Sequence, residues 1–522
     1  MKNTAHGRKF VALVPCLGLM LAAGGRADAA NLRIEQVTVV SPERTEPLRN
    51  ATVVVRDDRI VSVSAGEAKP AAAGETVVDG KGLYLTPGLI DSHVHLAEVP
   101  GMTPAQEQAH PAISKAARAQ FPRSYLLYGY TTLVDLISTP KRMAQWNAND
   151  VHPDTVFCGA TPVIGGYGIP DYFKGDELWR EYPYLLVQPG EESKVPKGID
   201  PATRTPQAVV ARMKADGAVC LKAFAEDGFG PPKYLPMIRI EVAKELVRAA
   251  HAAGLPVFMH ANAADMQTFA LEAGADVIAH GMWHWEVPPP ANPQPVALGT
   301  VSPAVKEILD EVVARKIGWQ PTIQVLHGLV DPFDPAYLAN PALGRVDPAD
   351  LIAWYRTPAP QGQWFHALVA ADFAKNPDGS ARSPAEIRAN AEAVFDPLLA
   401  QVTNATAYVV QHRGNILFGT DTPSAPTYAN QPGLNGFVEM HRLVAAGMTP
   451  AQVLRAATLA NAEALRMTKD LGTVQAGKRA NLLLMRDDPM HSVDAYASIV
   501  KVVVGGRMLD ASELVASRAA KH

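Results

Sequence analysis

Eight short apolar segments recur along the middle of this 522-residue chain, and stretches with helical spacing separate most of them. In the stretch 240–253, Val242, Leu246 and Ala250 fall on one helical face, and Gly254 supplies a stop signal. Near-continuous apolar runs of strand length are typical of parallel strands that are buried on both faces. The runs are 89–96, 131–136, 155–163, 218–224, 256–262, 276–282, 317–323 and 415–421. Eight such strands close a (β/α)8 barrel, which is the α/β fold that we predict.

An open, doubly wound parallel sheet is the alternative architecture. Its nucleotide-binding form carries a glycine-rich fingerprint after an early strand. This chain has no such fingerprint after its first apolar runs, so the closed barrel is favoured.

Both ends of the chain are rich in short segments of β-branched residues. Residues 33–40 near the start and 499–504 near the end have this composition and are bounded by turn residues. We therefore predict a small β-sandwich domain built from 31–88 and 471–522, with the barrel spanning 89–470.

Two predicted connections are long. Segments 164–205 and 283–303 each follow a predicted strand and exceed the roughly 15 residues above which an unstructured loop is usually functional or disordered. Connections that follow barrel strands form the active-site face, so we expect both to border the site.

The first 30 residues have the features of a secretory signal peptide. Lys2, Arg8 and Lys9 precede an apolar run at 10–23, and Ala27-Asp28-Ala29 fits a cleavage pattern. The apolar run is shorter than the about 20 residues that span a bilayer. We predict cleavage near Ala29-Ala30, a secreted or periplasmic protein and no membrane span.

Composition excludes several classes of protein. With 48 Lys+Arg against 52 Asp+Glu, the chain has no basic footprint for nucleic acid. Its 3 cysteines cannot build a disulfide scaffold, and we expect Cys158 and Cys220, which lie in apolar runs, to be buried thiols rather than a disulfide.

Six ionisable residues lie at or near the ends of the apolar runs. His93 and His95 are two residues apart, so strand alternation turns both imidazoles to the same side, here the barrel interior. The others follow on later runs and are Lys222, His260, His280 and Asp421. A single buried histidine is usually a core residue, but six such groups at the active-site end of one barrel indicate a functional centre.

This set of residues indicates a metal centre. Four imidazoles and a carboxylate suit zinc or a similar divalent ion. A lysine within an apolar run must be neutralised, paired or modified, because burying a bare ammonium is costly. Our hypothesis is that Lys222 reacts with CO2 to form a carbamate, an anionic ligand able to bridge two ions.

The motifs around these residues resemble those of the amidohydrolase superfamily. Thr86-Pro87-Gly88-Leu89-Ile90-Asp91-Ser92-His93-Val94-His95 is similar to its opening motif, and the order His-x-His, Lys, His, His, Asp is similar to its binuclear members. The segment 250–254 followed by His260 resembles an imidazolonepropionase-like and prolidase-like branch. The resemblance covers about residues 32–508.

The resemblance implies a role for each matching residue. His93 and His95 would hold one metal ion with Asp421, and His260 and His280 would hold a second. Carboxylated Lys222 would bridge two ions, expected to be Zn²⁺. A hydroxide between the ions would be the nucleophile, and Asp421 would act as the general base that passes its proton to the leaving group.

We therefore expect an exported binuclear enzyme that cleaves the C–N bond of a small amide, such as a dipeptide or an N-acyl amino acid. A cyclic amide, a lactone or a phosphotriester is an alternative substrate for the same site. A mononuclear deaminase is less favoured, because such sites lack the bridging lysine. A non-catalytic barrel that only binds a ligand is the alternative from another class.

Three further residues are predicted substrate contacts. Tyr167 lies in the first long connection, His284 in the second, and His327 follows the seventh apolar run. The fold is compatible with a homo-oligomer, but no residue specifies a number of subunits.

Overall fold

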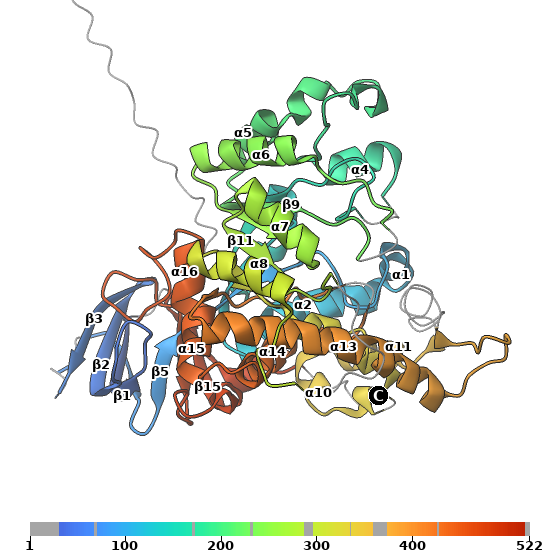
Figure 1. Cartoon of the computed structure of the whole chain (residues 1–522). Helices are drawn as coiled ribbons and strands as arrows, with labels where there is room; N and C mark the ends of the chain where they lie inside the picture. Colours follow the sequence, from blue (N-terminus) through green and yellow to red (C-terminus); the bar gives the residue numbers. More distant parts are fainter. Residues whose placement is uncertain are drawn as a thin grey trace, which may run out of the picture.

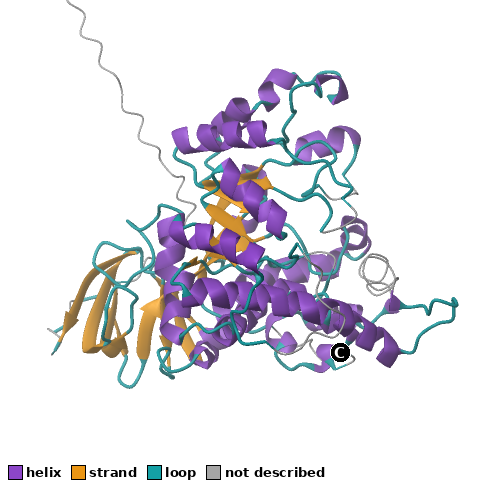
Figure 2. Cartoon of the chain, in the orientation of Figure 1, coloured by secondary structure: helices purple, strands orange, loops and turns teal. Residues whose placement is uncertain are grey.

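The computed structural model describes residues 31–516 except 67–69, 72, 170–172, 230–232, 287–295, 335, 359–372 and 425–426. The predicted signal peptide, residues 1–30, and part of the long connection 283–303 lie outside the described residues. The described chain contains a central parallel sheet surrounded by helices and a β-rich unit beside it (Figures 1 and 2).

The central sheet is parallel, and its strands are ordered as in the sequence. They are β6 (Leu89–Val94), β7 (Tyr130–Asp135), β8 (Asp154–Ala160), β9 (Cys220–Phe224), β10 (Val257–His260), β11 (Val277–Ala279), β12 (Gly318–Gln320) and β13 (Asn415–Ile416). Beyond β13, the backbone continues along β12, since Leu417 N donates to Trp319 O at 2.8 Å. It also meets the first strand, since Asp421 N donates to His93 O at 2.8 Å. The sheet therefore closes on itself, which confirms the predicted (β/α)8 barrel.

Helices occupy the connections between the strands (Figure 1). The helices before β12 are α1 (Pro104–Ala109), α2 (Pro111–Leu127), α3 (Pro140–Asn147), α4 (Gly175–Glu181), α5 (Pro206–Ala215), α6 (Ile240–Ala252), α7 (Ala264–Ala273) and α8 (Pro303–Ala314). Those after β12 are α9 (Ile323–His327), α10 (Leu343–Val346), α11 (Ala349–Tyr355), α13 (Pro384–Gln411), α14 (Leu434–Ala445), α15 (Pro450–Arg455), α16 (Asn461–Ala464) and α17 (Ala511–Leu514). A π-helical turn, Ala456–Ala460, joins α15 to α16.

Local signals explain where several helices begin and which faces they bury. In α6, Val242, Leu246 and Ala250 are buried, as their spacing predicts. Ser383 caps α13, and Glu386 completes a capping box. These helices bury an apolar stripe against the barrel, while capping satisfies the first amide groups.

The β-rich unit is built from both ends of the described chain. Its strands are β1 (Leu32–Val39), β2 (Leu48–Arg56), β3 (Arg59–Ala65), β4 (Thr76–Asp79), β5 (Tyr84–Pro87), β14 (Leu482–Met485), β15 (Ile499–Val504) and β16 (Arg507–Asp510). Strand pairing links them in one sheet of order β16-β15-β14-β5-β1-β2-β3, with β4 beside β1. Ile34, Val53 and Leu484 share one buried core, so the two ends fold together. This confirms a separate β-rich domain, and the predicted boundaries 31–88 and 471–522 stay a prediction.

The barrel interior below the site is apolar. Ile90, Cys220, Phe258 and Leu417 from the strands cluster with residues of the 460–471 region, including Leu465. Lys222 and His260 lie two residues further along the same strands as Cys220 and Phe258. The polar side chains therefore rest on an apolar floor.

The prediction of free thiols is wrong, because Cys158 and Cys220 form a disulfide. The two residues are register partners on the neighbouring strands β8 and β9, and their Cα atoms are 4.5 Å apart. This separation lies within the range that a disulfide requires. Sequence reasoning missed the bond because the cysteines are 62 residues apart and only strand pairing brings them together.

The disulfide is expected to stabilise the barrel. Replacing both cysteines with serine should lower the free energy of unfolding by about 2–4 kcal/mol, because the cross-link restricts the unfolded chain. In protein without residues 1–30, unreduced and denatured chains should show no reactive thiol, and reduced chains should show both. Two reactive thiols without reduction would contradict the bond.

In the part of the chain that the structure describes, no helix is both long and apolar enough to cross a membrane.

Candidate metal centre

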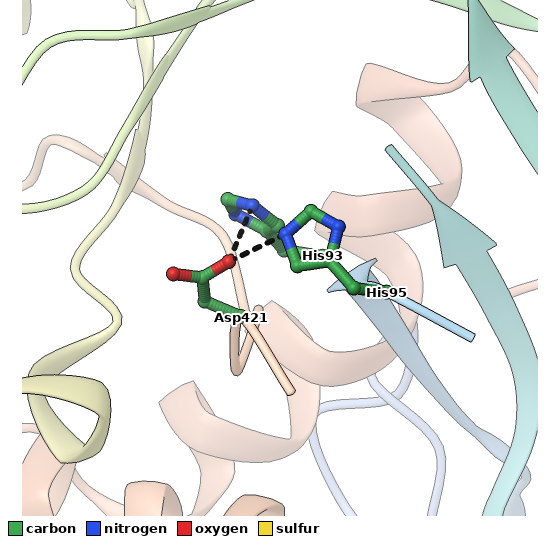
Figure 3. A group of neighbouring side chains, drawn as sticks. All are labelled: His93, His95 and Asp421. Carbon is green, nitrogen blue, oxygen red and sulfur yellow. Dashed lines mark hydrogen bonds and ion pairs between the residues drawn. The ribbon is translucent and has the colours of Figure 1, made fainter. Parts of the chain in front are cut away.

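The centre is formed by side chains at the carboxyl ends of the barrel strands. His93 and His95 come from β6 and the residue after it, and Asp421 follows the eighth strand segment (Figure 3). Asp421 Oδ1 lies 2.7 Å from His95 Nε2 and 3.1 Å from His93 Nε2. One ligand atom from each residue lies within 4.8 Å of the others. Two imidazoles and a carboxylate at this separation fit a zinc-type ion.

Lys222 lies beside this group. Its Nζ atom is 3.5 Å from His93 Nε2, and the residue is 1 % exposed. Burial lowers the pKa of Lys222 to about 7, because the charged ammonium is poorly solvated there. A large share of the side chain is therefore a neutral amine near neutral pH, the form that reacts with CO2.

His260 and His280 bring the second pair of imidazoles to the same place. Their ring centroids are 4.5 Å apart, and the rings of His280 and His93 are 5.0 Å apart. His280 Nδ1 lies 3.9 Å from Asp421 Oδ2. The structure therefore brings all six predicted residues into one buried cluster, although only His93, His95 and Asp421 form a compact ligand group in it.

Besides the contacts with Asp421, three of the four histidines have a hydrogen-bond partner on one ring nitrogen. His93 Nδ1 meets Gln320 Oε1 at 2.7 Å, and His280 Nδ1 meets Thr322 Oγ1 at 2.9 Å. His260 Nε2 meets Glu226 Oε2 at 3.2 Å. Such partners orient a metal-binding imidazole. The acceptor oxygens of Gln320 and Glu226 also determine which nitrogen of His93 and of His260 carries the proton. The opposite nitrogen of each ring is left for a ligand.

The electrostatics favour the forms that bind metal. Burial lowers the pKa of His93 to about 3 and lowers that of His280 well below its usual range. Burial would raise the pKa of Asp421, but His93 and His95 hold it well below its ordinary value. His93 and His280 are therefore neutral imidazoles beside an ionised carboxylate, as a divalent cation requires. His95 differs, because burial would lower its pKa but its hydrogen bond to Asp421 raises it.

Backbone conformation at the centre is also unusual. His280, Thr322 and Asp421 have φ angles of 80°, 48° and 56°, in the left-handed region that non-glycine residues rarely adopt. Each such residue costs on the order of 1–3 kcal/mol, and such residues gather at functional sites. The surrounding fold therefore holds three residues of this centre in a backbone conformation that is unfavourable for them.

A cavity of about 1010 Å³ opens onto the centre through His95 and Asp421. The side chains of these two residues are 16 % and 13 % exposed, whereas that of His93 is 1 % exposed. Aromatic lining residues include Phe121, Trp146, Tyr167, Phe173, Phe229 and Tyr234, and charged ones include Glu98, Glu107, Arg118, Asp135, Lys141, Arg142 and Glu181. The cavity thus has the predicted metal ligands His95 and Asp421 on one side and a wall of aromatic and charged side chains around them.

The sequence profile of the amidohydrolase family matches residues 386–509. Over 92% of this chain, the fold is similar to that of a Xaa-Pro dipeptidase crystallised with methionine in its active site, with a TM-score of 0.60, 19% identity and 100% of that structure covered. It is also similar to ochratoxinase from A. niger, with a TM-score of 0.60, 18% identity and 96% of that chain covered. The family match thus covers one part of the chain, and the solved structures share its fold over most of its length.

Curated relatives match over short segments. An adenine deaminase from Rubrobacter xylanophilus is 33% identical over 20% of this chain and 15% of its own length. A dihydroorotase from Bacillus licheniformis is 32% identical over 19% of this chain and 22% of its own length. The matched part therefore spans less than a quarter of either relative's length, and neither alignment transfers an activity.

Of the three predicted substrate contacts, Tyr167 lines the cavity. Its ring centroid lies 4.3 Å from that of His260. His284 and His327 are not among the residues that line this cavity. His284 lies in a backbone bridge with Ala263, and His327 ends α9, where burial lowers its pKa to about 3. Substrate contact by His284 and His327 stays a prediction, because neither residue lines this cavity.

Sequence reasoning missed the residues that hold the imidazoles. Gln320 and Thr322 lie at the end of the seventh apolar run, so their position at a strand end was a usable signal. Glu226 lies four residues after Lys222 and beyond β9, where no periodicity marks it. Glu98, three residues after His95, also lines the cavity, and burial raises its pKa to about 7.

Proposed function

We propose that this protein is a metal-dependent hydrolase that cleaves the C–N bond of a small amide at a binuclear centre. The observation that carries the proposal is the convergence of four imidazoles, Lys222 and Asp421 at the carboxyl ends of the barrel strands. The family match and the shared fold support the same class of reaction.

In this proposal, His93, His95 and Asp421 hold one ion, while His260 and His280 hold the other. Lys222, once carboxylated by CO2, would be a further anionic ligand shared by the two ions. Bound zinc would supply Lewis-acid polarisation and a water of lowered pKa. Asp421 would accept a proton of the attacking water at its carboxylate and return it to the leaving nitrogen.

The cavity wall supports a small charged substrate with an apolar portion. Lys141 and Arg142 line it, and Lys141 is 76 % exposed with only a 4.0 Å contact to Glu181. A dipeptide or an N-acyl amino acid carries a carboxylate that such cations attract. Tyr167, Phe229 and Tyr234 offer apolar surface beside it.

A deaminase is the second candidate, because the curated relatives that match short segments include an adenine deaminase. Lys222 favours the binuclear hydrolase over this alternative. Lys222 is buried and lies 3.5 Å from a predicted ligand histidine. There it could bridge two ions as a carbamate, whereas a mononuclear centre requires no bridging ligand.

Export is part of the proposal. The leader-like residues 1–30 and the Cys158–Cys220 disulfide both support an oxidising compartment such as the periplasm. Amino-terminal sequencing of protein secreted by its host would show whether the mature chain begins near Ala30.

Metal analysis combined with a substrate panel tests the function. Protein purified with zinc and bicarbonate should contain about two ions per chain, as a bridged binuclear site requires. It should hydrolyse dipeptides or N-acyl amino acids faster than cyclic amides, lactones, phosphotriesters or aminopurines. One ion per chain with turnover of aminopurines alone would support the deaminase instead, and metal uptake without any turnover would support a binding protein.

A further inference from the structure

Glu226 is a buried carboxylate next to a predicted metal ligand, and the proposed reaction does not use it. Its side chain is 0 % exposed, and that of His260 is 3 % exposed. Among the described residues, His260 is the one ionisable group that contacts this carboxylate. Burying a carboxylate is costly unless hydrogen bonds and nearby positive charge compensate it.

The loop after β9 holds the two oxygens of Glu226 in different roles. Oε1 accepts hydrogen bonds from the backbone N–H groups of Gly228, at 2.8 Å, and Phe229. Oε2 faces His260 Nε2 at 3.2 Å. An ionised carboxylate only accepts hydrogen bonds, so Oε2 accepts the proton of His260 Nε2 while Oε1 accepts from the backbone.

We propose that Glu226 is a positioning residue that holds His260 as its Nε2–H tautomer and leaves Nδ1 for the second metal ion. The carboxylate accepts the proton of Nε2, so the lone pair of the ring is on Nδ1. A separate backbone hydrogen bond, from Ala225 N to His260 O at 2.8 Å, joins the strand of Lys222 to the strand of His260 just before Glu226. This inference deepens the proposed binuclear function and rests on it.

Negative charge is the second contribution of Glu226. Two divalent cations exceed the charge of one carbamate, one Asp421 carboxylate and one hydroxide by a single positive unit. The Glu226 carboxylate, which is separated from the second ion by the His260 imidazole, would balance this remaining positive charge. The affinity for the second ion should therefore depend on Glu226 more than the affinity for the first ion does.

The isosteric substitution Glu226→Gln gives an unusual test. The backbone N–H groups of Gly228 and Phe229 require an oxygen, so the amide nitrogen of the introduced glutamine must face His260 and donate to Nε2. His260 then carries its proton on Nδ1, the atom that the ion needs. Glutamine should therefore be as harmful as alanine, whereas a purely structural role predicts that glutamine is tolerated.

The experiment compares wild type, Glu226→Gln, Glu226→Ala and Asp227→Ala. Asp227 is the matched control, because it lies in the same loop but pairs with Lys233 at 2.8 Å. In metal-free protein with ¹⁵N-labelled histidine, His260 should be protonated at Nε2 in wild type and control, and at Nδ1 in Glu226→Gln. Zinc titration should show second-ion affinity lower by about 10–100-fold in both Glu226 variants, with first-ion affinity unchanged.

Each result decides for or against the inference. A wild-type tautomer and wild-type second-ion affinity in Glu226→Gln would overturn it. Equal weakening of both ions with a lower melting temperature would also overturn it, since that indicates a structural role. A wild type that binds one ion would refute the binuclear function, and the tautomer measured without metal would still decide the role of Glu226.

Discussion

Asp421→Asn is expected to lower kcat/KM by about 10²–10⁴-fold, the range that a positioned acid–base group contributes. Oδ1 of Asp421 lies within hydrogen-bond distance of both His93 and His95. An asparagine amide cannot accept a proton from the nucleophile, and it is a weaker ligand than a carboxylate. The fold should be retained, because the barrel closure at this point uses the backbone N–H of Asp421.

The measurement is steady-state kinetics on the best substrate of the panel, with metal content and melting temperature for each variant. Glu181→Gln is the control, because Glu181 lines the same cavity but binds Arg142 at 3.1 Å, outside the centre. Its kcat should stay near that of the wild type. An Asp421→Asn enzyme with two ions and unchanged kcat would exclude Asp421 as the proton carrier.

Lys222→Ala is expected to reduce the metal content from about two ions per chain to about one and to lower kcat/KM by at least about 100-fold. Loss of a residue that only supports a ligand typically costs 10–100-fold, so loss of a bridging ligand should cost at least as much. Lys222 Nζ lies 3.5 Å from His93 Nε2, and Cys220 on the same strand is in a disulfide. The surrounding strands therefore have little freedom to move another ligand into the place of Lys222.

The pH dependence of metal uptake tests the carbamate separately. With a pKa of about 7, roughly a tenth of Lys222 is the neutral amine at pH 6 and roughly nine tenths at pH 8. Only the neutral amine reacts with CO2, so bicarbonate-dependent metal uptake should rise from pH 6 to pH 8. An ordinary lysine would stay protonated over this range. Lys222 would not be a bridge if metal uptake by the wild type did not depend on bicarbonate. The same conclusion would follow if Lys222→Ala still bound two ions.

Much of the site could be predicted because strands impose simple rules on their side chains. His93 and His95 share a face because successive strand residues alternate. Lys222, His260 and Asp421 stood out because each is ionisable in an apolar run, and barrel strands all end at one rim. The structure brings these residues together, as those rules require.

The groups that orient the ligands could not be predicted in the same way. Thr322 lies 42 residues from His280, and Gln320 lies 227 residues from His93, so each contact depends on strand order and tilt. Glu226 faces His260 because backbone N–H groups of its own loop turn it there. The local sequence pattern of that loop does not indicate that the Glu226 side chain faces His260.

The chain by itself determined the barrel, the β-rich unit from both ends and the six residues of the centre, because these follow from periodicity and strand ends. The tertiary structure alone decided the Cys158–Cys220 bond, the ring nitrogen that each histidine offers and the charged wall of the cavity. Those features depend on distances between segments far apart in the chain. Such distances are set by packing and backbone hydrogen bonds rather than by any local sequence pattern.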